Sequence, residues 1–115
     1  MQNTTHFSGK TALIMGAGRG IGLATAQVLA SLGAKVVLAA RNEQEIEKQA
    51  LLIKQQGEIA GAITCDVSRY SSVLNAVDYC LSQHGQIDFL INNAGVIEPL
   101  TTLVESDPSL WGLAA

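Results

Sequence analysis

Short apolar runs alternate with amphipathic segments along this chain, and the alternation restricts the possible fold more than any other sequence feature. The apolar runs cover residues 11–15, 35–40, 59–65 and 87–91, and helical spacing of apolar residues follows over 21–32, 43–56 and from 68 onward. Continuous apolar strands alternating with helices are typical of a parallel sheet that is covered on both faces. With right-handed crossovers, the pattern predicts a doubly wound α/β fold showing its βαβαβαβ portion.

Capping signals support the predicted helices. Gly33 suits the position after the first helix, Asn42 with Glu45 three residues later forms a capping-box arrangement, and Ser68 can cap the third helix. The third helix carries one apolar stripe, formed by Val73, Ala76, Val77, Cys80 and Leu81. The alternative of four helices joined by apolar loops is disfavoured, because the apolar runs are too short and too evenly placed.

Composition narrows the class of protein. The 115 residues allow one domain at most, and 48% hydrophobic against 15% charged residues indicates a chain rich in core residues. The net charge of −3 with scattered basic residues predicts no nucleic-acid or membrane partner. Cys65 and Cys80 show no ligand spacing, so we expect reduced, buried thiols and no metal site. The polar N-terminus is no secretory signal, so we expect a cytoplasmic protein.

A glycine-rich turn follows the first apolar run, Gly16-Ala17-Gly18-Arg19-Gly20-Ile21-Gly22. The spacing GxxxGxG fits Gly16, Gly20 and Gly22, whereas GxGxxG and the P-loop pattern do not fit. Such glycines allow a tight exit from the strand, close approach of the backbone to a pyrophosphate, and helix packing at a helix N-terminus that favours anions. A turn that is merely a tight connection is the alternative interpretation.

With two further motifs, the sequence resembles a classical short-chain dehydrogenase/reductase. The motifs are the glycine turn, Asp66-Val67 after the third apolar run, and Asn92-Asn93-Ala94-Gly95 after the fourth. Met15 departs from the family, which commonly has threonine there. The resemblance implies that residues 1–115 are a single NAD(P)-binding Rossmann-like domain, the N-terminal portion of the family's fold.

The resemblance also assigns roles to individual residues. Asp66 would accept a hydrogen bond from the adenine amino group, with Val67 against the ring, although Asp66 can equally help to start the next helix. Asn92 to Gly95 would form the floor near the nicotinamide-side ribose, or else an ordinary strand-to-loop turn. The residues expected to bind the cofactor are Gly16, Gly18, Arg19, Gly20, Ile21, Gly22, Arg41, Asn42, Asp66, Val67, Asn92, Ala94 and Gly95.

The end of the second apolar run bears on which cofactor binds. NAD-binding folds usually place a carboxylate there to bind the ribose 2′-hydroxyl, but this chain has Ala40 followed by Arg41. A guanidinium suits the oxygens of a 2′-phosphate, and Arg19 is a second cation that could reach it. We therefore expect NADP(H) to be preferred over NAD(H).

Proton-transfer residues of the family are not found in this chain. The resemblance implies a Ser, and a Tyr with a Lys four residues later, but Tyr70 is followed by Leu74 and Tyr79 by Gln83. The helix start at Asp107-Pro108 is followed by only seven residues, which suggests a truncated chain.

Three accounts of the chain stay open. The resemblance implies the N-terminal part of an NADP(H)-dependent oxidoreductase for a small alcohol or carbonyl substrate, with no catalytic residue in this chain and a homo-oligomer in the full-length form. The alternative is a non-catalytic dinucleotide-binding or regulatory protein. A flavodoxin-like domain would need an FMN phosphate loop in place of residues 16–22.

Overall fold

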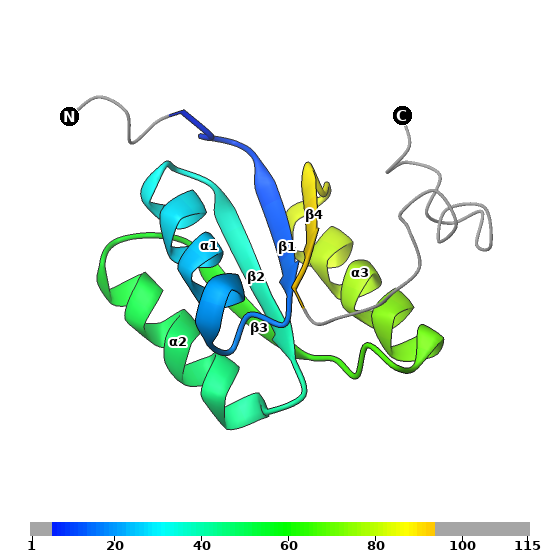
Figure 1. The fold of residues 1–115 in the computed structure, drawn as a ribbon. Helices are drawn as coiled ribbons and strands as arrows, with labels where there is room; N and C mark the ends of the chain where they lie inside the picture. Colours follow the sequence, from blue (N-terminus) through cyan, green and yellow to red (C-terminus); the bar gives the residue numbers. More distant parts are fainter. Residues whose placement is uncertain (1–5, 94–115) are drawn as a thin grey trace.

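The computed structural model describes residues 6–93. Its elements, in chain order, are β1 (Thr11–Met15), α1 (Gly20–Ser31), β2 (Lys35–Ala40), α2 (Glu43–Gln55), β3 (Ala60–Thr64), α3 (Tyr70–His84) and β4 (Phe89–Asn92). The strands form one sheet in the order β3-β2-β1-β4, and every neighbouring pair is parallel (Figure 1). The predicted doubly wound, Rossmann-like α/β architecture is confirmed.

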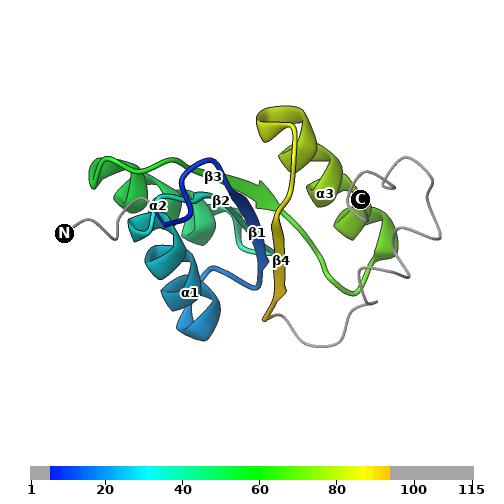
Figure 2. The ribbon, with the colours of Figure 1, turned by 90° about the horizontal axis from the view of Figure 1, so that it is seen from above.

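Helices cover both faces of the sheet. Figure 2 shows α1 and α2 on one side of the strands and α3 on the other. A hydrophobic core lies on each face of the sheet. Because side chains alternate along a strand, β1 and β2 each contribute side chains to both cores. Ile14 and Leu38 pack toward the α1 and α2 side, whereas Leu13 and Val37 pack toward α3. The chain crosses from β3 to β4 around the central β1, so the winding direction reverses there, where ligands bind in such sheets.

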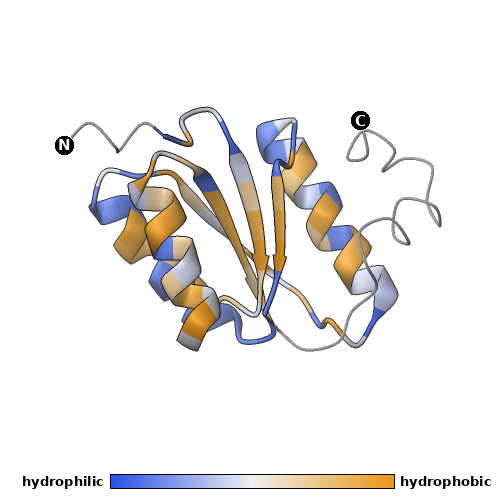
Figure 3. Ribbon diagram, turned by 45° about the horizontal axis from the view of Figure 1, so that its top comes forward, coloured by the Kyte–Doolittle hydropathy of each residue, from blue (hydrophilic) through white to orange (hydrophobic). Residues whose placement is uncertain are grey.

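The central strands form the interior of the domain. All residues of β1 are buried, whereas the edge strands β3 and β4 are largely half-buried. Figure 3 shows largely apolar strands between helices along which apolar and polar residues alternate. Burying one Leu, Ile or Val contributes roughly 1.5–3 kcal/mol, so the strands β1 and β2 hold much of the hydrophobic stabilisation.

The boundaries of the elements agree with the sequence for β1 and β2 and differ elsewhere by a few residues. The strand expected over 59–65 covers Ala60–Thr64, and the one expected over 87–91 covers Phe89–Asn92. The prediction of Ser68 as the cap of α3 is wrong, because the helix starts later, with Arg69 at the N-cap. The hydroxyl of Ser68 instead donates to Asp66 Oδ1 over 2.6 Å, which holds the loop before the helix.

The other helix signals are borne out, with one difference. Gly33 follows α1 with φ 100°, a conformation that favours glycine. The Asn42 side chain caps α2 by accepting a hydrogen bond from Glu45 N at 3.0 Å. The Glu45 carboxylate, however, contacts Arg19 at the start of α1 rather than completing a capping box.

Cys65 and Cys80 are buried, free thiols, and burial raises the pKa of Cys80 to about 11. The helix start at Pro108 lies outside the described residues.

A carboxylate fastens the amino ends of β1 and β4. Asp88 Oδ2 accepts hydrogen bonds from the backbone N of Thr11 at 2.8 Å and from Gln86 Nε2 at 2.6 Å. Gln86 Nε2 also donates to the carbonyl of Gly9 at 2.9 Å. The side chains after α3 therefore join β4 to the start of the central strand, at the end of the sheet where the strands begin.

Removing this carboxylate should destabilise the domain. We expect Asp88→Ala to lower the free energy of unfolding by about 1–2 kcal/mol, because a partly buried N–H loses its acceptor. Urea unfolding followed by circular dichroism measures the loss. Asp78→Ala removes an exposed carboxylate from α3 and should change stability by less than about 0.5 kcal/mol. Equal losses in both variants would contradict the assignment.

Candidate functional site

The glycine turn between β1 and α1 requires glycine for steric reasons. Gly16 has φ 77° and Gly20 has φ 67°, values that side-chain-bearing residues rarely adopt. A Cβ at Gly22 would lie 2.9 Å from the backbone carbon of Gly16 and would overlap its oxygen, so the helix can approach the turn only without a side chain there. A Cβ at Gly20, by contrast, would enter open space. The backbone around Gly20 is therefore accessible.

The N-terminus of α1 has the features of an anion site. Arg19 occupies the N-cap without a side-chain hydrogen bond to the helix, and the first turn carries no acidic residue. The first N–H groups of a helix lack partners within the helix and carry its positive dipole end. The α2 N-terminus differs, because Asn42 caps it and Glu43 and Glu45 lie in its first turn. Of these two helix starts, α1 suits a phosphate better.

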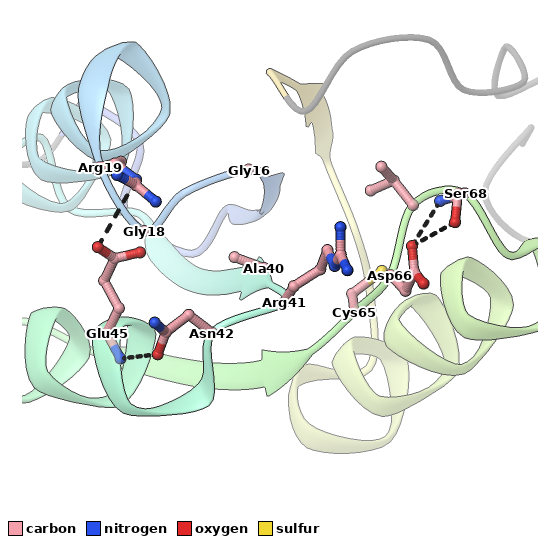
Figure 4. A pocket seen from close by; sticks show the side chains of 11 residues that line it. Gly16, Gly18, Arg19, Ala40, Arg41, Asn42, Glu45, Cys65, Asp66 and Ser68 are labelled. Carbon is pink, nitrogen blue, oxygen red and sulfur yellow. Dashed lines mark hydrogen bonds and ion pairs between the residues drawn. The ribbon is translucent and has the colours of Figure 1, made fainter.

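A cleft of about 460 Å³ opens at the carboxyl ends of β1, β2 and β3 (Figure 4). Its lining consists of Gly16, Gly18, Arg19, Ala40, Arg41, Asn42, Glu45, Cys65, Asp66, Val67 and Ser68. The turns after all three strands contribute, so residues far apart in the sequence meet in this cleft. Of the residues expected to bind a cofactor, the cleft collects Gly16, Gly18, Arg19, Arg41, Asn42, Asp66 and Val67.

The other expected residues lie elsewhere. Gly20, Ile21 and Gly22 form the start of α1 and are not among the residues that line the cleft, and the side chain of Ile21 is largely exposed. Asn92 ends β4, beside Met15 of β1. Ala94 and Gly95 lie outside the described residues.

Two residues without an expected binding role take structural positions. Met15 is fully buried and packs in the core beneath α3, which is why an apolar side chain fits at this position. Tyr79 lies on α3 and packs at the border of the same core, as expected for a helix residue.

Asp66 presents an ionised carboxylate in the cleft. Its Oδ1 accepts from the hydroxyl of Ser68 at 2.6 Å and from the backbone N of Ser68 at 3.0 Å. The Ser68 hydroxyl and backbone bonds lower the pKa of Asp66, and the charges of Arg41 and Arg69 lower it further. Both Ser68 bonds end on Oδ1, so Oδ2 is not used by them. The carboxylate is therefore held in its charged, hydrogen-bond-accepting form.

The structure adds Glu45 to the site, a residue that the sequence motifs did not indicate as a binding residue. The carboxylate of Glu45 lines the cleft and lies 3.9 Å from Arg19 Nε. The sequence did contain one signal for Glu45, the cap formed by Asn42. This cap holds Glu45 in the first turn of α2, and the helix begins beside the cleft. The side chain's direction toward α1 depends on the packing of two helices and is not visible in a local pattern.

Residues 6–93 offer little support for other kinds of site. No group of three or more metal-ligating side chains occurs in that range. Within the same range, no helix is long and apolar enough to cross a bilayer.

The turn geometry predicts different costs for alanine at two glycines. Gly22→Ala should lower the free energy of unfolding by about 2 kcal/mol or more, because its Cβ meets rigid backbone. Gly20→Ala meets no neighbouring atom and should lose only roughly 1 kcal/mol from the unfavourable φ. Urea unfolding of both variants gives the comparison. The explanation fails if Gly20→Ala is the more damaging change.

The hydrogen bonds at Asp66 predict a pH effect. In Ser68→Ala the pKa of Asp66 should rise toward its ordinary value, read from the carboxyl ¹³C shift against pH. A carboxyl whose pKa is lowered by folding stabilises the fold above about pH 4 and loses that contribution as the pH falls through its folded pKa. The variant should therefore lose less stability on acidification. Ser71→Ala, an exposed change on α3, serves as control, and an equal pKa of Asp66 in both variants would refute the Ser68 hydroxyl as the cause.

Comparison with known proteins places these features in a family. The family model described as short chain dehydrogenase matches residues 10–111. Tropinone reductase-like 1 of Erythroxylum coca is 42% identical over 107 residues, which cover 90% of this chain and 38% of the relative. The chain thus spans about two fifths of the length of this curated relative.

Solved structures agree with the match. A metagenomic short-chain oxidoreductase in complex with NADP superposes with a TM-score of 0.73 at 38% identity, covering 92% of this chain and 48% of that one. NAD⁺-bound xylitol dehydrogenase gives a TM-score of 0.74 at 41% identity, covering 78% and 35%. The family model, the sequence identity and the parallel sheet agree, and the chain belongs to the short chain dehydrogenase family.

Proposed function

We propose that this chain is the NAD(P)-binding domain of an NADP(H)-dependent oxidoreductase acting on a small alcohol or carbonyl compound. The observation that carries the proposal is the cleft itself, where the glycine turn after β1 meets Arg41 after β2 and Asp66 after β3. Ala40, and not a carboxylate, ends β2. The preference for NADP(H) over NAD(H) rests on that absence together with the two arginines that line the cleft.

The residues present fit a dinucleotide along the carboxyl edge of the sheet. The open backbone at Gly20 and the uncapped start of α1 suit a pyrophosphate. Asp66 would accept a hydrogen bond from the adenine amino group, with Val67 against the ring. Arg41 and Arg19 would bind a 2′-phosphate. Asn92, at the end of β4, would lie on the nicotinamide side of this arrangement, where Ala94 and Gly95 would add backbone contacts.

A bound nicotinamide would supply the hydride acceptor or donor of the reaction. This chain's own described residues bind and orient the dinucleotide and take no part in proton transfer. No tyrosine among the 115 residues is followed by a lysine four positions later, so we place the Ser, Tyr and Lys of the family outside this sequence. A cytoplasmic location and a homo-oligomeric whole protein are part of the same proposal.

The known structures support a nicotinamide dinucleotide but differ in which one they contain. The metagenomic oxidoreductase was solved with NADP and the xylitol dehydrogenase with NAD⁺. The preference of this chain between NADP(H) and NAD(H) is therefore tested by substituting its own residues at the end of β2.

The combined change Ala40→Asp with Arg41→Asp should reverse the preference toward NAD⁺. The new carboxylate at position 40 can accept a hydrogen bond from the 2′-hydroxyl, and a 2′-phosphate loses the Arg41 cation and meets two negative charges. We expect the ratio of the dissociation constants for NADP⁺ and NAD⁺ to rise by about tenfold or more, in isothermal titration calorimetry.

Lys48→Asp, an exposed charge reversal on α2 outside the cleft lining, is the control for a general effect of added negative charge. An unchanged cofactor ratio in the double variant would sink the proposed preference. Equal shifts in the double variant and in the control would show a general charge effect and would sink it as well.

A further inference from the structure

We propose that Glu45 sets the strength of the cofactor preference, by holding Arg19 and by opposing a 2′-phosphate in the cleft. The inference rests on the proposed function, since it concerns the same binding site. It assigns to Glu45 a specificity-determining role that the end of β2, with Ala40 and Arg41, does not reveal.

The position of Glu45 is fixed from both of its ends. Its backbone N donates to Asn42 Oδ1 at 3.0 Å, which anchors the residue in the first turn of α2. Its carboxylate lies 3.9 Å from Arg19 Nε and against the glycine turn, where a Cβ at Gly18 would come within 3.1 Å of Glu45 Cδ. Figure 4 shows the side chain rising from α2 toward Arg19 and the turn. The absence of a side chain at Gly18 makes the space that this carboxylate occupies.

The two side chains of the ion pair differ in burial, and Glu45 is the more buried of them. The Glu45 side chain is 30% exposed, whereas that of Arg19 is 86% exposed. The Arg19 guanidinium is therefore mostly in solvent, whereas the Glu45 carboxylate is the more enclosed of the two. A 2′-phosphate that enters the cleft would compete with Glu45 for Arg19. The same phosphate would be repelled by the Glu45 carboxylate.

With Glu45 included, the positive and negative charges of the cleft lining are equal in number. Arg19 and Arg41 are matched by Glu45 and Asp66, which gives the described lining no net charge. The charge of Arg41 acts on Asp66, since it lowers the pKa of that carboxyl. Each arginine therefore has an acidic neighbour within the cleft, and a phosphate meets a weaker positive field than two unopposed arginines would create. The site therefore retains affinity for dinucleotides that lack a 2′-phosphate.

Two small probes isolate the effect from catalysis. Adenosine 2′,5′-bisphosphate carries the 2′-phosphate and 5′-AMP does not, and both are titrated calorimetrically into the whole chain at low salt. Glu45→Gln keeps the size of the side chain and removes its charge. We expect it to tighten binding of the bisphosphate about two- to fivefold, as for an exposed ion pair, and to change the dissociation constant of 5′-AMP by less than about twofold.

Controls separate this effect from a general gain of positive charge. Glu43→Gln removes an acidic charge from the same helical turn outside the cleft lining, and it should affect the two probes about equally. In an Arg19→Gln background the gain from Glu45→Gln should shrink, because part of it comes from releasing Arg19. Raising the salt concentration should also shrink it. Glu45→Ser gives a second variant should Glu45→Gln fold poorly.

The outcomes distinguish this inference from the function on which it rests. If the unmodified chain binds neither probe, the proposed cofactor site is wrong, and this inference falls with it. If the unmodified chain binds the bisphosphate but Glu45→Gln leaves the ratio of the two dissociation constants as Glu43→Gln does, the role of Glu45 alone is refuted. A selective gain for the bisphosphate in Glu45→Gln supports it.

Discussion

The close approach of Gly22 to the backbone of Gly16 is the contact on which the rest of this structure depends. It lets α1 start directly above the end of β1, without a side chain to separate them. Once α1 is held there, its small residues Ala26 and Ala30 pack against the sheet, and β2 can return beside β1 in parallel register. Because α1 begins just after the carboxyl end of β1, its first N–H groups lie at the edge of the sheet where the cleft opens.

Local patterns were sufficient for most of the fold. The buried strands β1 and β2 read as continuous apolar runs because both of their faces are covered, and Asn42 caps α2 through a bond to a residue three positions away. The start of α3 was harder to place, because Ser68 has the chemistry of a cap but uses it on Asp66. A serine hydroxyl can satisfy either partner, and the path of the loop decides between them.

The candidate site was predictable to a lesser degree. The glycine turn, Arg41 and Asp66 could be found because each lies within two residues of the end of a strand, and parallel strands bring their carboxyl ends to one edge. Glu45 could not be placed in the same way. Its capping-box spacing pointed to a bond within its own helix, whereas the fold directs the carboxylate to Arg19, at the N-cap position of α1. The distance between two helices is a tertiary quantity, and no pattern within either segment contains it.

The cleft joins two kinds of surface that differ in their tolerance to substitution. At the glycine turn the wall is main chain; the positive φ angles of Gly16 and Gly20 disfavour other residues, and the contact at Gly22 excludes a side chain. At the end of β2 the wall is made of side chains, and Arg41 is exposed and contributes little to the core. Mutation can therefore reshape the second wall at small cost in stability while the first stays constant. Among proteins built on this domain, we therefore expect the residues at the end of β2 to vary and the glycine turn to stay unchanged.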